Sequence, residues 1–173
     1  TVKVKVTNTG AVKGKSVVQV YAQVPYIEGG VEKAAIQVAG YGKTGVIDPG
    51  KDETVTVTID RYLLASYDEK AAKTYILDAG DYYLSVGDDA HDALNNVLAA
   101  KGKTGMYDHN GKTVEGDAAK TWKYTLDALD KTTYSKSKTG ADVTNRFTDD
   151  TIFSTDYNYF KEGTVQYLTR RDW

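Results

Sequence analysis

Apolar and polar residues alternate along several short stretches in the first half of the chain. Residues 2–7 (VKVKVT) place three valines on one side and two lysines on the other. Residues 53–59 (ETVTVTI) repeat the pattern, with threonines on the polar side. A period of two residues is typical of a strand with one buried face, so both stretches are predicted to be strands.

Four more stretches are rich in β-forming residues and are separated by turn residues. We expect strands, the second of them bulged because it contains three glycines, at 15–24, 36–47, 75–77 and 82–86. The connections between them are too short for the helical crossovers that parallel strands need. The pattern therefore predicts a mainly all-β fold, an antiparallel sandwich of the immunoglobulin and fibronectin III type.

The alternation also predicts which side chains are buried. In residues 15–24 the apolar side chains should face the core, with Gln19 and Gln23 on the opposite side. Four aromatic residues fall on predicted core faces, namely Tyr75, Tyr82, Trp122 and Tyr124. Aromatic side chains bury large areas, so core packing is the expected role of these four.

The period changes after residue 88 and predicts one short helix at about 89–101. Asp88 or Asp89 is the expected N-cap, and Asp92 completes a box-like start. Leu94, Val97 and Leu98 form the predicted apolar stripe. Gly102 follows as a C′ stop, because glycine accepts the left-handed conformation at that position.

The second part of the chain has too little apolar periodicity for a core of its own. It offers one clear strand at 122–126, a short helix within 144–153 and a strand-like run at 164–168. We therefore expect 1–102 to form the sandwich with its capping helix. Residues 103–173 are expected to be an irregular extension that packs on the sandwich or on a neighbouring domain.

Composition narrows the function classes. The net charge is −2, so neither nucleic acid nor an anionic membrane is an expected partner, and no apolar run approaches a membrane span. The chain has no cysteine, which excludes disulfides and thiol catalysis and slightly favours a reducing compartment such as the cytoplasm. Residue 1 lies inside an alternating run, so we expect an internal part of a longer polypeptide.

The candidate chemical motifs all have simpler interpretations. Three acids and one histidine lie close together at 88–92 (DDAHD). A metal or acid–base site is possible there, but acids at a helix N-terminus, where they complement the helix dipole, are the simpler interpretation. Residues 108–111 (DHNG) are predicted to form a tight turn, because the ligand spacing of a calcium loop is missing. His91 and His109 have no i, i+4 partner, so no metal or cofactor site is expected.

Residues 40–45 (GYGKTG) match G-x-G-x-x-G in letters. No amphipathic helix follows them, so a bulged strand is preferred to a dinucleotide fingerprint. There is no G-x-S-x-G elbow. Some of the remaining tyrosines are candidates for a sugar-facing or domain-facing surface, namely Tyr26, Tyr41, Tyr62, Tyr67, Tyr83, Tyr107, Tyr157 and Tyr159.

Five segments in order carry a family resemblance: VKVKVTNTG at 2–10, GKSVVQVYAQVPY at 14–26, EKAAIQVAGYGKT at 32–44, DPGKDETVTVTI at 48–59 and LASYDEKAAKTYILDAGDYYLSVGDDAHDALNNVLAAKG at 64–102. Together they resemble the fibronectin type III-like domain of family 3 glycoside hydrolases, especially bacterial β-glucosidases. The resemblance covers about the first hundred residues and implies a non-catalytic part of a larger enzyme of carbohydrate metabolism.

The tail resembles a connector found in members with reversed domain order. GADVTNRF at 140–147 and VQYLTRRDW at 165–173 carry this likeness, although Thr169 stands where the family has serine. In those members the domain follows an α/β sandwich domain and precedes the catalytic (β/α)8 barrel, and both are the implied partners. Asp172 looks like the family's nucleophile in Ser-Asp-Trp, but Arg171 precedes it. We assign Asp172 to the connector, so the resemblance transfers no catalytic residue.

The resulting hypothesis is an accessory domain without catalytic activity of its own, in a parent glycosidase that cleaves terminal β-linked sugars. One alternative is a carbohydrate-binding module with weak sugar contacts, which the surplus tyrosines suggest. Another is a cell-surface adhesin or spacer domain, which would have tandem sandwich copies beside it. A β-domain removed from its neighbours leaves an apolar patch, so self-association is also expected.

Overall fold

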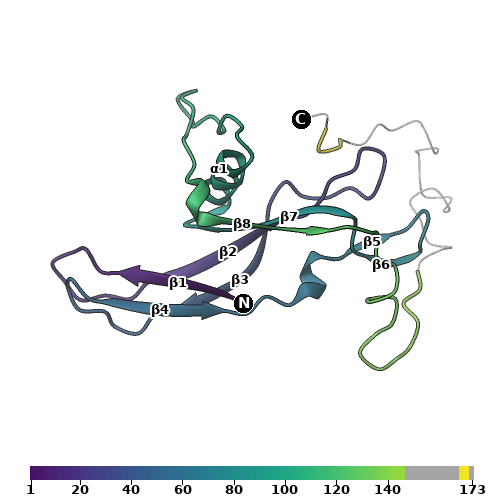
Figure 1. Ribbon diagram of the computed structural model, residues 1–173, viewed down its shortest axis with the longest axis horizontal. Coiled ribbons are helices and arrows are strands. Elements are labelled where there is room, and N and C mark those ends of the chain that lie inside the picture. Colours follow the sequence, from purple (N-terminus) through teal and green to yellow (C-terminus); the bar gives the residue numbers. More distant parts are fainter. Residues whose placement is uncertain (147–167, 172–173) are drawn as a thin grey trace, which may run out of the picture. The chain divides into compact units, whose positions relative to one another are not determined.

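The computed structural model describes residues 1–146 and 168–171 (Figure 1). The chain forms two compact units, each built from three segments. The first unit comprises Thr1–Pro25, Ala34–Leu64 and Ala79–Ala128. The second unit comprises Tyr26–Lys33, Ala65–Asp78 and Leu129–Trp173.

Antiparallel strands make up most of the first unit. β1 (Val2–Thr7) pairs with β4 (Asp52–Val57) in a two-stranded sheet. A four-stranded sheet has the order β3 (Gln37–Lys43), β2 (Val17–Gln23), β7 (Gly80–Gly87), β8 (Thr121–Leu126). Figure 1 shows the β1–β4 pair beside β2 and β3. The antiparallel arrangement with one short α-helix confirms the predicted sandwich fold.

A valine core joins the two sheets of this unit. Its fully buried members are Val2, Val18, Val20, Val55 and Val57, and half-buried side chains from β1, β7 and the end of β4 pack against them. Burying one such side chain contributes roughly 1.5–3 kcal/mol, so this cluster is the main stabilising element of the unit. The period-two pattern that predicted β1 and β4 therefore places the correct faces inward.

Glycines let β3 lie close to this core. A Cβ atom on Gly42 would be 2.5 Å from Val55 Cγ1, and one on Gly40 would be 2.8 Å from Val57 Cγ1. The pairing register between β2 and β3 shifts between Val20 and Tyr21, which leaves Ala39 as an extra residue on β3. The predicted bulged strand is confirmed, and the G-x-G-x-x-G letters serve packing.

Helix α1 (Ala90–Ala100) begins and ends as predicted. Asp89 is the N-cap, where its side chain accepts from the backbone N–H of Asp92 at 2.8 Å. Asp92 in turn accepts from the N–H of Asp88 at 3.0 Å. At the other end Gly102 has φ +65° and the N–H of Lys103 donates to Leu98 O at 2.9 Å, which closes a Schellman motif.

The buried face of α1 differs from the prediction. Leu94 and Leu98 are only half-buried, whereas Ala93, Asn95, Asn96 and Val97 are buried. The apolar stripe was wrongly placed because the amide side chains of Asn95 and Asn96 bind backbone groups of β7 and of the loop at 103–120. Burial of polar side chains is tolerated where their hydrogen bonds are satisfied.

Two further positions in this unit correct the predicted faces. Gln23 is buried, because its amide donates to Ala35 O at 2.7 Å and its carbonyl accepts from Lys101 Nζ at the end of α1. Trp122 is 45% exposed, because β8 is an edge strand whose outer end has little to pack against. Both errors arise from neighbours that the strand pattern does not reveal.

The second unit contains an antiparallel hairpin of β5 (Ser66–Asp68) and β6 (Thr74–Ile76). Short 3-10 turns occur in the first unit at η1 (Arg61–Leu64) and at η2 (Ala118–Lys120). Residues 147–167 are outside the described part, so the predicted helix at 144–153 and strand at 164–168 stay predictions.

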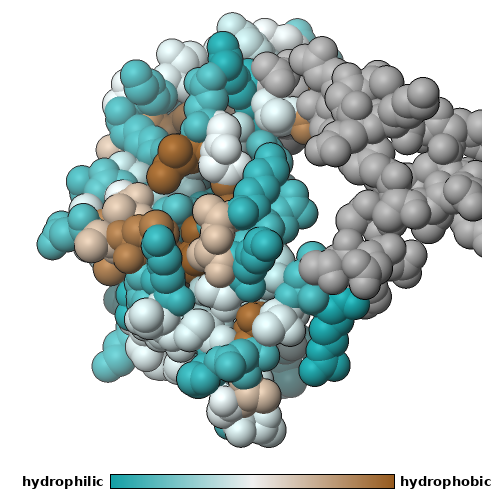
Figure 2. All heavy atoms as spheres, turned by 90° about the vertical axis from the view of Figure 1, so that its right-hand side faces the viewer, coloured by the Kyte–Doolittle hydropathy of each residue, from teal (hydrophilic) through white to brown (hydrophobic). Residues whose placement is uncertain are grey.

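In the part of the chain that the structure describes, no helix has the length and apolar character needed to cross a membrane. On the face drawn in Figure 2, hydrophobic residues lie in small areas between hydrophilic ones. The exposed apolar side chains of the second unit include Ile27, Leu129 and Leu168. Self-association remains a prediction.

Candidate functional site

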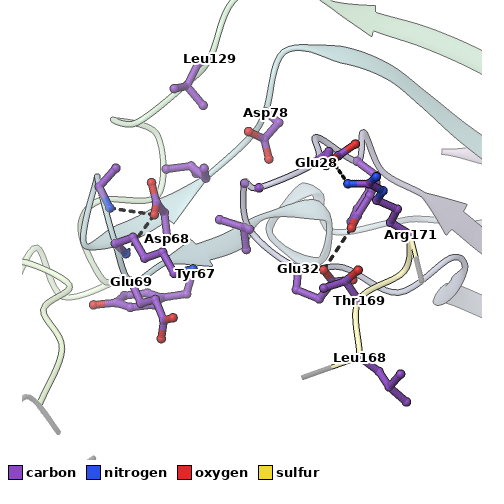
Figure 3. A pocket seen from close by; sticks show the side chains of 17 residues that line it. Glu28, Glu32, Tyr67, Asp68, Glu69, Asp78, Leu129, Leu168, Thr169 and Arg171 are labelled. Atoms are coloured by element: carbon purple, nitrogen blue, oxygen red, sulfur yellow. Dashed lines mark hydrogen bonds and ion pairs between the residues drawn. The ribbon is translucent and has the colours of Figure 1, made fainter. Parts of the chain in front are cut away.

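The second unit contains a hollow of about 760 Å³ (Figure 3). Its walls come from the loop at 26–33, from the β5–β6 hairpin with its turn, from Leu129 and from residues 168–171. Four sequence segments that are far apart along the chain therefore meet around one space. No alternating pattern links them, so sequence periodicity gave no signal for this site.

Acids outnumber cations in the lining of the hollow. Glu28, Glu32, Asp68, Glu69 and Asp78 contribute carboxylates, against the two cations of Lys70 and Arg171. Such an excess of negative charge would suit a cation or an acid–base pair if the carboxylates were free. The contacts of each acid decide between these possibilities.

Asp68 is held by the turn that joins β5 to β6. It accepts hydrogen bonds from the backbone N–H groups of Lys70, Ala71 and Ala72 at 3.1, 3.0 and 2.9 Å. The N–H groups of Ala71 and Ala72 lower the pKa of the Asp68 carboxyl below its ordinary value. Asp68 therefore stays ionised at neutral pH and serves the turn.

Asp78 forms a buried ion pair with Lys33. The side chains are only 11% and 5% exposed, and Lys33 Nζ donates to Asp78 Oδ2. Lys33 ends the 26–33 loop and Asp78 follows β6 by two residues, so the pair fastens the loop to the hairpin. This carboxylate is committed to structure.

The remaining acids with partners are on the 26–33 loop. Glu28 pairs with the guanidinium of Arg171, and Figure 3 shows the two side chains directed toward one another. Glu32 accepts from the Tyr26 hydroxyl at 3.2 Å and from the backbone N–H of Arg170 at 2.7 Å. Glu69 alone among the five has no hydrogen bond or ion pair with a described residue.

These contacts do not fit the acid–base chemistry of glycoside cleavage. That reaction needs a carboxylic acid with a raised pKa beside a second carboxylate. Among the described residues, the three carboxyls with displaced pKa values all move downward, because hydrogen bonds hold Asp68, Asp81 and Asp130 in their ionised forms. Of these three carboxyls, Asp68 lines the hollow, where its hydrogen bonds serve the turn between β5 and β6.

Asp130 shows the downward shift most strongly. Its side chain accepts from the hydroxyl and N–H of Thr133 and from the N–H of Thr132, and these bonds lower the pKa of Asp130 far below its ordinary value. Its backbone pairs with Leu77, which follows β6. Asp130 thus fixes the start of the segment after the first unit.

Replacing Asp130 with alanine should destabilise the chain by about 1 kcal/mol at pH 7, as for other capping side chains. Because the folded-state pKa is the lower one, the contribution is present above the unfolded pKa of about 3.9 and is lost as the pH falls below it. Urea unfolding at pH 7 and pH 2.5 should show the difference shrinking. Asp127→Ala, an exposed neighbour, should change neither value; equal losses at both pH values would contradict the assignment.

The sequence-predicted clusters serve turns and caps. Residues 88–92 form the reciprocal cap of α1 described above, and His91 Nδ1 lies 3.2 Å from Asn95 Nδ2. Asp108 accepts from the N–H groups of Asn110 and Lys112 at 2.8 and 2.9 Å in a tight turn, as predicted. Within the described residues, no three metal-binding side chains gather at one place.

The described tyrosines proposed for a sugar-facing surface are divided between the two units, with Tyr26 and Tyr67 in the second and the others in the first. Tyr41 and Tyr107 are both 69% exposed, on β3 and in the loop after α1, respectively. Tyr67 contacts Tyr75 edge to face at 5.5 Å, and Tyr83 lies under Lys101 Nζ at 4.5 Å. Tyr157, Tyr159 and the connector residue Asp172 are outside the described residues.

Comparison with known proteins agrees with the sandwich fold. Residues 16–90 match the family model of the fibronectin type III-like domain. The chain is 37% identical over 94 residues to beta-glucosidase A of Butyrivibrio fibrisolvens and 37% identical over 93 residues to a beta-glucosidase of Ruminococcus albus. Each alignment covers 51% of this chain but only 11% and 10% of the relative.

Solved structures of β-glucosidases are also similar to this chain. A β-glucosidase from Paenibacillus barengoltzii is similar with a TM-score of 0.51 and 28% identity, over 74% of this chain and 12% of that protein. A β-glucosidase from Kluyveromyces marxianus, at 19% identity and a TM-score of 0.50 over 73% of this chain and 12% of that protein, shares the fold.

The antiparallel sandwich and the match at 16–90 define a fibronectin type III-like domain. The relatives that align with this region are β-glucosidases, so the chain fits a fibronectin type III-like domain of a family 3 β-glucosidase, as the sequence resemblance predicted. It spans about a tenth of the length of the curated relatives it matches, whose polypeptides contain other domains.

Proposed function

We propose that this chain is a non-catalytic accessory domain of a β-glucosidase-like glycoside hydrolase, whose task is to hold neighbouring domains in place. The observation that carries the proposal is the use of its carboxylates. Asp68, Asp78 and Asp130 are bound to backbone N–H groups, a buried lysine or threonines, and these contacts give them structural roles.

The length of the relatives supports the same division of labour. The matched region is a small part of proteins named β-glucosidases, so the two carboxylates of a retaining mechanism have ample room elsewhere. In the proposed arrangement, 1–102 is the body of the sandwich and 103–173 is the extension that leads toward the catalytic barrel. The extension also adds β8 (Thr121–Leu126) to the four-stranded sheet, beside β7. An α/β sandwich domain and the (β/α)8 barrel are the proposed neighbours.

The first experiment measures hydrolysis of an aryl β-glucoside by purified residues 1–173. We expect no turnover above that of buffer, because Asp68 and Asp78 in the hollow are bound to backbone N–H groups and to a buried lysine, respectively. Activity that persists through repeated purification and scales with protein concentration would overturn the non-catalytic assignment.

The scaffolding part needs the longer polypeptide. The reading frame that encodes the chain should be expressed with and without residues 1–102 and assayed for turnover and thermal unfolding. We expect the deletion to remove turnover and to lower the temperature of unfolding of what remains. A truncated protein with unchanged kcat and unfolding temperature would show that the domain braces nothing.

A further inference from the structure

The 26–33 loop and residues 168–171 meet through a set of contacts that accessory function alone does not explain. Tyr26, Glu28 and Glu32 on the loop contact the consecutive residues Arg170 and Arg171, although these are 138 or more positions away in sequence. We name these three loop residues the arginine clamp. They belong to the same compact unit as the segment they hold.

Arg170 is held by its backbone and its side chain. Its N–H donates to Glu32 Oε1 at 2.7 Å, and its guanidinium carbon lies 5.1 Å from the centre of the Tyr26 ring. The Tyr26 hydroxyl donates to the other oxygen, Glu32 Oε2, at 3.2 Å. One tyrosine therefore both stacks on the arginine and orients the carboxylate that takes its N–H.

Arg171 is held by charge. Its guanidinium pairs with Glu28, and both side chains are about two-thirds exposed, at 63% and 65%. The clamp thus opposes two cations with two carboxylates and adds an aromatic face. A planar guanidinium suits both kinds of partner better than the compact ammonium of lysine does.

The clamp residues are presented from a fastened loop. The buried Lys33–Asp78 pair anchors the loop directly after Glu32, and Gly30 N–H donates to Ile27 O at 3.0 Å to form a turn between the clamp residues. A preorganised site loses less conformational entropy on binding than a flexible one. The loop is therefore shaped before the arginines arrive.

We propose that Tyr26, Glu28 and Glu32 form a binding site for a consecutive arginine pair, occupied by Arg170–Arg171 of the same chain, which fixes residues 168–171 against the 26–33 loop. The occupant is this segment because its backbone and both side chains match the clamp group by group. The site goes beyond the proposed function and does not depend on it, since it exists whether or not the parent protein cleaves glycosides.

Cleavage by an arginine-specific protease tests the clamp on the whole chain. The sequence has four arginines, at 61, 146, 170 and 171, and Arg146 is exposed, so cleavage there provides an internal reference rate. Proteolysis of this kind follows the population of the open form. We expect cleavage at 170 and 171 to be slower than at 146, and Glu28→Gln to accelerate it by roughly two- to fivefold, as expected for a partly exposed ion pair.

The double variant Glu28→Gln/Glu32→Ala should accelerate cleavage by about tenfold, because it also removes a charge-assisted hydrogen bond. Glu69→Gln is the matched control: it removes one negative charge from the same hollow but no contact to the arginines, and it should leave the ratio unchanged. Arg171→Glu alone should speed cleavage after Arg170, because it places two acids opposite one another. Adding Glu28→Arg restores the pair with its charges exchanged and should make cleavage after Arg170 slow again.

The unmodified chain provides a test that requires no substitution. Raising the salt concentration to 1 M screens the exposed pair and should speed cleavage at 170 and 171 relative to 146. Hydrogen exchange at the Arg170 amide should be faster in Glu32→Ala than in Glu69→Gln. Equal cleavage at all exposed arginines, insensitive to salt and to both glutamates, would overturn the clamp while leaving the glucosidase assays unaffected.

Discussion

Replacing Lys33 with methionine should lower the free energy of unfolding by about 3–5 kcal/mol. The substitution keeps the length and most of the volume of the side chain but removes its charge. Asp78 then stays buried without the lysine that neutralises it, and the cost of the lost ion pair dominates the change. Urea unfolding at pH 7 gives the measurement.

The physical origin of this effect can be tested with two further proteins. Lys33→Met combined with Asp78→Leu removes both charges and should recover most of the loss, because a buried ion pair and a well-packed apolar pair are often similar in free energy. Lys136→Met breaks an ion pair in the same unit whose side chains are 60% and 73% exposed, and it should cost no more than about 1 kcal/mol. If Lys33→Met costs no more than Lys136→Met, the Lys33–Asp78 pair does not anchor the loop.

The elements with local signals could be predicted from the sequence. The alternation in β1 and β4 has a buried valine core as its cause, and the caps of α1 depend on residues within four positions of one another. Gly40 and Gly42 predicted an irregular strand, and the structure shows why β3 needs them: valine side chains occupy the space of a Cβ atom. Each of these features needs only neighbouring residues, or one facing strand.

The features that the sequence did not reveal depend on distant partners. Nothing local distinguishes Glu28 and Glu32 from other exposed acids, because Arg170 and Arg171 approach them from the far end of the chain. The alternation in the sequence predicts that Gln23 faces solvent, but in the structure Lys101 binds it and it is buried. The sequence contains an acidic segment at 28–32 and an arginine pair at 170–171, whose opposite charges are a signal that they could meet. Counting charges along the chain does not show that the two segments are neighbours in space.

Asn96 is a buried polar residue whose role depends on distant partners, and its replacement by alanine should lower the free energy of unfolding by about 2–4 kcal/mol. Its amide nitrogen donates to Val86 O at 3.0 Å, and its oxygen accepts from the N–H of Asp117 at 2.7 Å. Asn96 is 1% exposed, so alanine removes the amide partner of both backbone groups, at about 1–3 kcal/mol for a buried group that loses its bond. Val86 O then keeps the longer bond from Ser85 Oγ at 3.4 Å. The side chain thus joins β7 to the loop that precedes η2.

The loop cannot easily find other partners, because its backbone already lies against α1. A Cβ atom at Gly116 would be only 2.0 Å from Asn95 O, so the backbone next to Asp117 has no room to shift toward the helix. Hydrogen exchange should therefore rise in residues 105–117 of Asn96→Ala, together with the loss of global stability in urea. Asn110→Ala, in an exposed turn of the same loop, should stay within about 0.5 kcal/mol of the unmodified chain. A loss of stability for Asn96→Ala no larger than for Asn110→Ala would contradict this role of Asn96. It would mean that water replaces the amide and that the other contacts of the loop, such as the close packing at Gly116, suffice to hold it.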